Sequence, residues 1–299
     1  MSGHLARVRM ADRAATVALW AIAVFVVGIL LAIIVHFLIA SLDTLRLSFL
    51  FGDPSDTAVG GIGPVLWNSV YMLGLTLLIT IPLGLLGGIY MAEYATEGRL
   101  TSAIRFSQEL ISSVPSIVVG LFGLAFFVGA TGWGFTALSG ALALTVFNLP
   151  LLSRLTEQAI RAVPDDERAA SLALGTPKWP TIRHVVLPLA IPGLVTGLIL
   201  TAGRIFGEAA ALIFTAGLST PTSYDFSNLN LLDPQSPWSP FRPCTTLAVY
   251  IWKLNSEGLS PYARVIADTS AAVLVLMVLV FNLSSRGIGR ALQRRITGA

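Results

Sequence analysis

Two long stretches of this 299-residue chain carry almost no ionisable side chain. The first runs from Arg13 to Asp43 and contains only His36, and the second runs from Glu109 to Arg154 and contains none. A helix needs about 20 apolar residues to cross a bilayer, so the second stretch alone has room for two spans and a turn. The charged fraction of the chain is 12%, about half of that in a soluble domain of this length. The sequence therefore predicts an all-α polytopic membrane protein.

Six membrane-spanning helices fit the apolar runs. They are expected near residues 14–40, 66–91, 110–129, 135–153, 188–216 and 264–284. Gly and Thr in 129–134 predict a tight turn between the third and fourth spans, and Gly, Pro and Asp in 52–64 predict a loop. The run 244–258 predicts a short helix at the outward membrane interface, anchored by Tyr250 and Trp252, with a partial seventh span as the alternative.

The basic residues predict the orientation of these spans. Fourteen Arg and Lys residues fall on the side of the two termini and four on the opposite side, while Arg204 lies within a span. Because basic loops stay in the cytoplasm, both termini are expected inside. The first apolar run is too long for the core of a signal peptide and is interpreted as a retained span. The net charge of +3 follows from this asymmetry and gives no reason to expect a nucleic-acid partner.

Several classes of site are absent from the sequence. No Gly-x-x-x-x-Gly-Lys-Ser/Thr loop occurs, because neither Lys178 nor Lys253 follows a glycine. The chain is therefore not expected to bind ATP phosphates through such a loop. It contains no His-Glu-x-x-His motif and no Cys/His spacing for a metal, and the single Cys244 excludes an intrachain disulfide. These absences argue against an enzyme, and no catalytic residue, metal or cofactor is expected.

The connection between the fourth and fifth spans predicts a helix, a sharp turn and a second helix. Pro164 suits the first helical position, and the acidic residues 165–167 suit the positive end of a helix dipole. Gly175 suits a C-terminal cap, after which Thr176 and Pro177 start the second helix. A plain connection would not need this structure. The Leu and Ala side chains of the pair either dock a partner protein or pack against the underside of the chain itself, and the sequence leaves both open.

The same loop resembles the cytoplasmic signature of ABC importer permeases. That signature is Glu-Ala-Ala, three residues, Gly, nine residues, Ile, one residue and Leu-Pro. In this chain nine residues separate Gly175 from the segment 185–188, Val-Val-Leu-Pro, and the Glu position is occupied by Ala169. The resemblance implies a coupling helix that docks onto an ATPase subunit, with one polar contact missing. The residues that it assigns to this coupling are Ala169, Ala170, Leu172, Leu174, Gly175 and Pro188.

Other stretches extend the resemblance over most of the chain. Residues 67–94 are similar to the first core span of such permeases, and 114–122, 172–182 and 204–217 are similar to the phosphate-importer branch, the PstA-type permeases. This branch usually has Thr and Pro at positions 209 and 211, where this chain has alanines. The resemblance implies a type I importer permease fold of the MetI-like kind in a bacterial inner membrane.

The resemblance also implies a division of the chain. Residues 1–65 would hold a cytoplasmic N-terminal segment, the first span and an outward loop. Residues 66–284 would form a permease core of five spans with the coupling loop at 161–187, and 285–299 a basic cytoplasmic tail.

The implied partners are a second, PstC-type permease in a heterodimer, two PstB-type ATPase subunits and an extracytoplasmic phosphate-binding protein. The implied function is import of inorganic phosphate by alternating access. Another oxyanion such as molybdate or sulfate, a passive channel and a membrane interaction protein are the alternatives.

One predicted span contains two charged residues, Arg204 and Glu208. Four residues apart on a helix, they are expected to share one face and to pair. Each costs about 2.5–3.5 kcal/mol near the bilayer centre, and the pair returns only a few tenths, so the face is expected to look onto protein or a hydrated path. In the functional interpretation, Arg204 binds a tetrahedral oxyanion and Glu208 holds the guanidinium in place.

A packing interpretation of the same span is also open. Gly203 and Gly207, like Gly193 and Gly197, are four residues apart and would allow close contact with a neighbouring helix.

Overall fold

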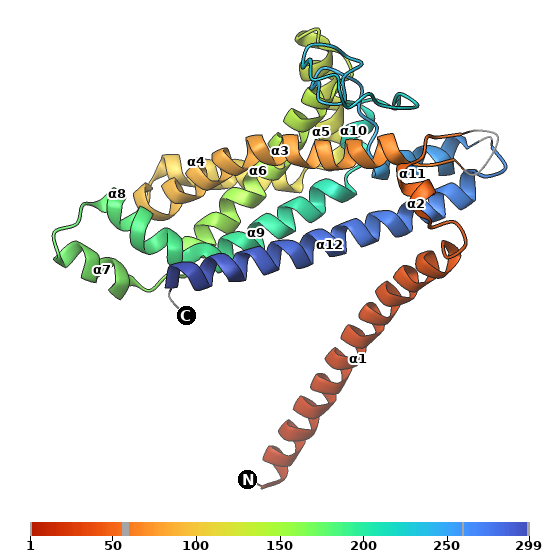
Figure 1. Cartoon of the computed structure of the whole chain (residues 1–299). Helices are drawn as coiled ribbons and strands as arrows, with labels where there is room; N and C mark the ends of the chain where they lie inside the picture. The colour runs from red at the N-terminus through yellow and green to blue at the C-terminus, as the bar shows by residue number, and fades with distance from the viewer. Residues whose placement is uncertain (1, 56–59, 259, 298–299) are drawn as a thin grey trace.

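The computed structural model describes residues 2–55, 60–258 and 260–297, and every regular element among them is helical (Figure 1). The side chains of residues 2–9 lie outside this description, as do those of 292, 293 and 295–297. They include Arg7, Arg9 and Arg295, whose charges contribute to the predicted orientation. The all-α prediction is confirmed.

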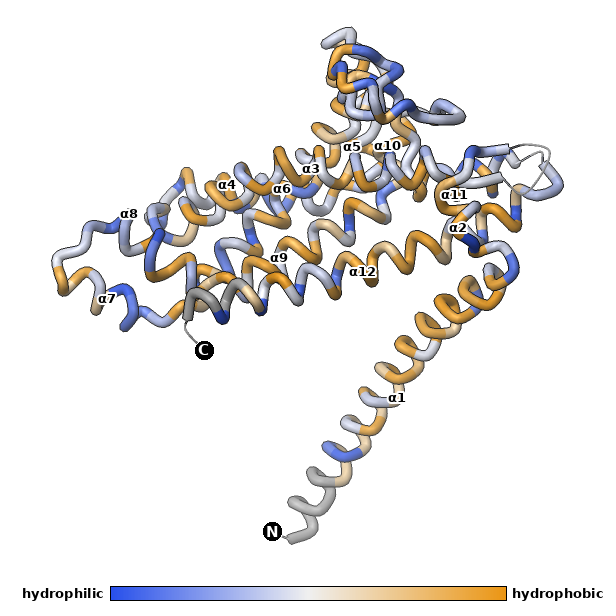
Figure 2. Tube along the Cα trace, in the orientation of Figure 1, coloured by the Kyte–Doolittle hydropathy of each residue, from blue (hydrophilic) through white to orange (hydrophobic). Residues whose placement is uncertain are grey.

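The first helix, α1 (Ser2–Ala40), stands apart from the other helices and meets them only near its C-terminal end (Figure 1). Most residues of its segment Met10–Ala40 are apolar (Figure 2), and no residue in the most apolar part of this segment is buried by the rest of the chain. At its end, the hydroxyls of Thr44 and Thr269 share a hydrogen bond of 2.6 Å that ties this region to α12. Such a helix needs lipid or another protein around it. The loop that follows contains a short unpredicted helix, α2 (Leu47–Phe51).

Four long helices form the body of the molecule: α3 (Gly63–Ile89), α6 (Ala137–Arg161), α9 (Leu187–Gly207) and α12 (Ala263–Thr297). A π-helical turn, η1 (Tyr90–Tyr94), extends α3. Helices α3 and α6 pack closely at Gly88, where only glycine leaves enough room. A Cβ at this position would lie 2.4 Å from the Cβ of Thr156. The buried hydroxyl of Thr80 donates a 3.0 Å hydrogen bond to Thr145 across the same contact, as polar groups between membrane helices commonly do.

The predicted third span, 110–129, is wrong in its shape. Residues 110–113 belong to an amphipathic helix, α4 (Arg99–Ser113), that buries none of its residues. After a bend of 100° the chain continues as α5 (Ser116–Gly123) and the π-helix η2 (Leu124–Ala130). Pro115 lies at the break, where it cannot donate a backbone hydrogen bond and keeps the preceding residue out of the helical region. The turn predicted at 129–134 is confirmed by positive φ angles of 73° at Gly132 and 72° at Gly134.

Five helices in the described part of the chain are long and apolar enough to cross a membrane, and the bent pair α4–α5 gives a sixth if it counts as one span. The last helix exceeds its prediction, since α12 continues past residue 284 through most of the predicted basic tail. The predicted helix in 244–258 is confirmed as α11 (Leu247–Glu257). Its first turn is buried against the body of the protein and the helix packs against α12, while the predicted anchor Trp252 is 42% exposed.

Candidate translocation and coupling sites

Arg204 lies in the last turn of α9 and packs on an aromatic ring. Its guanidinium carbon is 3.7 Å from the centroid of Phe147, close enough for a strong cation–π contact. Phe147 is near the middle of α6, so the cation sits deep in the helical body rather than at either end. The side chain is partly exposed. An arginine at this depth must face protein or water rather than lipid.

Glu208 does not continue the helix that carries Arg204. Helix α9 ends at Gly207, and Glu208 has an extended backbone, with φ −78° and ψ 122°. Its Oε1 accepts a 3.1 Å hydrogen bond from the backbone N–H of Ala211, at the start of the short helix α10 (Ala210–Ile213). The predicted span 188–216 therefore stops early, and the predicted shared helix face is wrong. The two side chains form no ion pair, and Glu208 Oε1 instead accepts from a helix terminus whose N–H groups need an acceptor.

One side of the broken segment packs on protein, where Ala211 and Leu212 are buried, while Gly207 is exposed and residues 208–210 are partly exposed. A non-helical backbone at membrane depth is tolerated where it packs on protein or lines a hydrated path. Helix α10 packs against α5 and α6. The approach to α5 is so close that a Cβ on Gly120 would lie 2.8 Å from the Cα of Ala211. The break is therefore a built feature of the interior and not a frayed helix end.

The surroundings of Arg204 are open within this chain. In the described part of the molecule its guanidinium has no hydrogen-bond or ion-pair partner. A Cβ added at Gly203 or Gly207 would meet nothing within 4 Å, whereas one at Gly193 or Gly197 would touch α6 at 2.7 and 3.0 Å. The packing interpretation thus fits the first half of α9. The half that carries Arg204 leaves guanidinium donors free beside open space.

The predicted helix–turn–helix of the coupling loop is confirmed. It consists of α7 (Asp165–Ala173), a turn at Gly175, α8 (Lys178–Thr181) and the π-helix η3 (Ile182–Val186). Gly175 has φ +79°, a left-handed conformation that glycine adopts without strain and that caps the helix. Pro188 stands in the first turn of α9 and is partly buried.

One side of this loop is fixed to the body of the protein by residues that the sequence prediction missed. Arg168 donates to the carboxylate of Glu93 at 3.0 Å and to the carbonyls of Ile160 and Val163, both at 2.6 Å. Lys178 donates to the backbone carbonyl of Glu93. Glu93 and Arg168 are 75 residues apart, and no local pattern links them.

The other side of the loop is exposed. Leu174 is 87% and Leu172 49% exposed, and Ala169, Ala170 and Gly175 are also uncovered. The two alternatives for this loop therefore apply to different faces, with Arg168 anchoring one face while apolar side chains project from the other.

A second arginine, Arg242, is fully buried, although it is one of the four basic residues that the charge count places on the side opposite the termini. It donates to Asn68 Oδ1 at 2.7 Å, to the Tyr224 hydroxyl at 2.6 Å and to the carbonyl of Pro237 at 3.0 Å. Its ligands are neutral, and their number explains how the charge is accommodated. Burial raises the pKa of Tyr224 to about 12, although the neighbouring Arg242 opposes the rise. This arginine ties the irregular segment 217–246 to the N-terminal end of α3.

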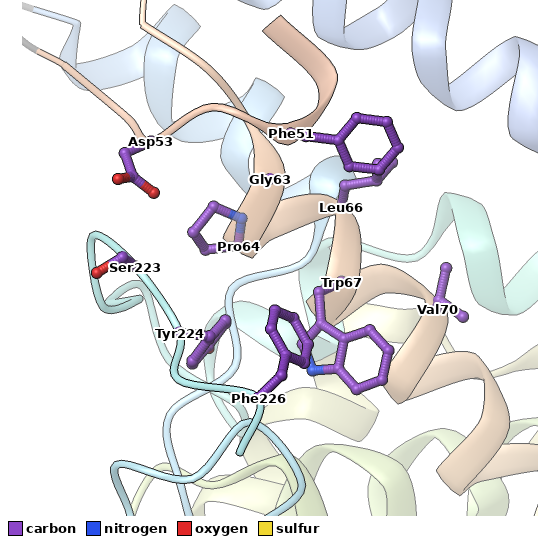
Figure 3. A pocket seen from close by; sticks show the side chains of 10 residues that line it. All are labelled: Phe51, Asp53, Gly63, Pro64, Leu66, Trp67, Val70, Ser223, Tyr224 and Phe226. Atoms are coloured by element: carbon purple, nitrogen blue, oxygen red, sulfur yellow. The ribbon is translucent and has the colours of Figure 1, made fainter. Parts of the chain in front are cut away.

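A cavity of about 420 Å³ opens beside this tie (Figure 3). Aromatic side chains dominate it, and the rings of Trp67 and Phe226 meet edge to face with centroids 5.2 Å apart. Among the described residues that line it, Asp53 is the one charged residue and none is Arg or Lys. A carboxylate disfavours anions, so this cavity is a poor candidate for an oxyanion site compared with the surroundings of Arg204.

Comparison with known families gives a long match. The family described as "binding-protein-dependent transport system inner membrane component" matches residues 84–298. The probable ABC transporter permease protein YqgI of Bacillus subtilis (strain 168) is 48% identical over 97% of this chain and 98% of its own length. The phosphate transport system permease protein PstA of Xylella fastidiosa (strain 9a5c) is 35% identical over 78% of this chain and 76% of its own length.

Solved structures agree on the fold. A bacterial alginate ABC transporter chain superimposes with a TM-score of 0.63 at 15% identity, over 92% of this chain and 96% of that one. A chain of the MetNI methionine ABC transporter in an inward-facing conformation gives a TM-score of 0.59 at 20% identity, over 76% of this chain and 94% of that one. These likenesses confirm the predicted MetI-like fold.

Proposed function

Because the chain belongs to the family of binding-protein-dependent transport system inner membrane components, we propose that it is the permease subunit of an ATP-driven importer for inorganic phosphate. Relatives named as phosphate permeases, at 33–35% identity, support the substrate. The name of the Bacillus relative gives no substrate, so the anion itself needs a test.

The observation that carries the proposal is the state of Arg204. Its guanidinium is fixed at the depth of Phe147, lacks a hydrogen-bond partner among the described residues and borders open space. A guanidinium fork matches the oxygens of a tetrahedral oxyanion and is always charged. Since Glu208 caps α10 instead of pairing with it, the fork is free to bind a passing anion and to release it.

The mechanism that we propose is alternating access with both termini in the cytoplasm. One of the two ATPase subunits binds the exposed face of this chain's coupling loop, around Leu172 and Leu174. Closure of the ATPase dimer moves this loop, and the Arg168–Glu93 contact transmits the motion to η1 and α3. The spans then open towards an extracytoplasmic phosphate-binding protein, and Arg204 meets the released anion in a path shared with a second, PstC-type permease.

Phosphate uptake into vesicles that contain the complete complex tests this proposal. The Arg204→Gln variant is expected to lose uptake while the ATPase subunit still copurifies. Arg204→Lys keeps the charge without the fork and is expected to recover only part of the activity. Arg264→Gln, at an exposed arginine on the outward end of α12, is the matched control and should transport normally. Normal uptake by Arg204→Gln would refute the role of this side chain.

Anion replacement in the same vesicles tests the substrate. Phosphate, delivered with the binding protein, is expected to stimulate ATP hydrolysis, and sulfate and molybdate are not. If sulfate or molybdate stimulates ATP hydrolysis and phosphate does not, the substrate is that other oxyanion. Uptake without ATP would identify a passive channel.

A further inference from the structure

A second cluster of arginines lies away from the proposed path, at the end of α12. Arg286 and Arg290 are both exposed and line a cavity of about 340 Å³ between α12 and the first half of α9. Spaced four residues apart, they lie one helical turn from each other on one face. Gly289, between the two arginines, lets α12 approach α9 closely at this cavity, since a Cβ there would lie 2.9 Å from Val195 on α9.

These two arginines have no acidic partner. Neither takes part in an ion pair within the described residues, and no Asp or Glu lines the cavity. Its α9 wall consists of Pro192, Val195, Thr196, Ile199 and Leu200. The hydroxyl of Thr196 already donates to the carbonyl of Pro192 in its own helix. The cavity therefore combines two unneutralised cations with a mainly apolar wall.

The surface beside the cavity is apolar and uncovered within this chain. On α12, Leu279 and Leu283 precede Arg286 and Arg290 at helical spacing on the same face, and they are 44% and 70% exposed. On α9, Leu200 is 53% exposed. The C-terminal end of α12 lies near the start of α9, on the side of the molecule that carries α7 and α8 (Figure 1). Cations at the end of an apolar stripe match an amphiphile with an anionic head.

We propose that this cavity binds the phosphate group of an anionic phospholipid from the leaflet next to the coupling loop. Arg286 and Arg290 bind the headgroup phosphate, and an acyl chain lies along Leu279, Leu283 and Leu200. Basic pockets between membrane helices on the cytoplasmic side are suited to such headgroups, because each basic residue near the surface adds about 1 kcal/mol of attraction. The proposal requires only that the helices span a bilayer and does not depend on the transported substrate.

Native mass spectrometry of the detergent-solubilised complex tests the site with phosphatidylglycerol as the probe and phosphatidylcholine as the zwitterionic comparison. Wild type is expected to retain phosphatidylglycerol preferentially. The Arg286→Gln and Arg290→Gln variants are expected to lose about fivefold each in lipid affinity, and the double variant about 30-fold. Arg264→Gln, the matched exposed arginine at the opposite end of α12, should bind as wild type does.

Two further arms identify the occupant. Inorganic phosphate at millimolar concentration should not displace the lipid, and displacement would mean a site for free anions. A photo-crosslinking residue at position 200 should react with lipid, and reaction with the second permease would mean a subunit interface instead. Equal retention of phosphatidylglycerol by wild type and the double variant would also overturn the proposal. The outcome of these lipid-binding experiments is independent of the outcome of the phosphate-uptake experiments.

Discussion

Replacement of Arg242 by Met is expected to loosen the irregular segment 217–246 from α3, to which the arginine ties it. The arginine is fully buried, and its guanidinium joins α3 at Asn68 to Tyr224 and Pro237 in that segment. Methionine fills part of the volume but donates no hydrogen bond. The segment would then depend on its remaining contacts to stay closed.

The size of the free-energy change depends on which hydrogen bonds the acceptors of Arg242 retain after the substitution. The Asn68 Oδ1 atom still accepts from the Tyr224 hydroxyl at 2.9 Å, and the Pro237 carbonyl still accepts from Trp67 Nε1 at 3.0 Å. Neither becomes an unpaired buried group, so the loss is that of the charge-assisted hydrogen bonds, about 2–4 kcal/mol in the free energy of opening. At 1.4 kcal/mol per factor of ten, the open population rises roughly 30- to 700-fold.

The single cysteine provides the assay. Cys244 is fully buried two residues from Arg242, and burial raises the pKa of its thiol to about 11. In the closed segment the thiol is therefore both inaccessible and protonated at pH 7, so its reaction with a maleimide reports opening. The labelling rate of Arg242→Met should exceed that of wild type by the factor above.

Two outcomes would refute this reasoning. One is wild-type labelling at the rate of a free thiol, because the segment would then not be closed. The other is equal labelling of wild type and Arg242→Met, because the arginine would then not hold the segment. Arg264→Met removes an exposed arginine on the same side and should leave the labelling rate unchanged.

Three further predictions concern the coupling loop and the same outward segment. Gly175→Val should destabilise the folded loop by about 1–2 kcal/mol, because the φ of +79° at this position disfavours a β-branched residue. The variant should therefore take up less phosphate per ATP hydrolysed, whereas Gly175→Asn should be tolerated. Equal uptake per ATP in the two variants would contradict this prediction. A double-mutant cycle of Glu93→Gln and Arg168→Met should give a coupling free energy of about 1–3 kcal/mol in thermal unfolding of the complex, since both side chains are largely buried. If the free-energy changes of the two single variants simply add, the proposed link from the loop to α3 is wrong. Folding raises the pKa of Tyr224 from about 10 to about 12. The neutral Tyr224 side chain therefore contributes its full stabilisation of the folded state below pH 10, and this contribution is lost as the pH rises to 12. Cys244 labelling should report this loss once the intrinsic thiol reactivity at each pH is subtracted, and Tyr224→Phe should flatten the alkaline dependence.

The features predicted correctly from the sequence are those that a short segment decides alone. Hydropathy over a run such as Arg13–Asp43 determines whether a helix can span a bilayer, whatever surrounds it. The turn at Gly175 is equally local, because the glycine, the preceding acidic helix start and the following proline act within a few residues.

The features that were missed depend on partners far away in the chain. Arg242 is held by Asn68, 174 residues earlier, and Arg168 by Glu93, 75 residues earlier. Nothing in the flanking sequence distinguishes these arginines from solvated ones. The sequence predicts one continuous span at 110–129, whereas the structure bends by 100° at Pro115 and packs α5 against α6 and α10.

The error at Glu208 is the most instructive, because it changes what Arg204 is able to do. Spacing of four predicts an ion pair only if the helix continues through both residues. Where α9 stops, the first N–H groups of α10 have no acceptor within a helix, and leaving such groups unpaired away from water would cost several kcal/mol each. The Glu208 carboxylate meets that larger demand at Ala211, and a cation–π contact with Phe147 holds Arg204 in place of the ion pair. A ring fixes the position of a guanidinium without occupying its N–H donors, which an ion pair would have done. The broken helix is thus the reason why Arg204 can offer its hydrogen bonds to an anion.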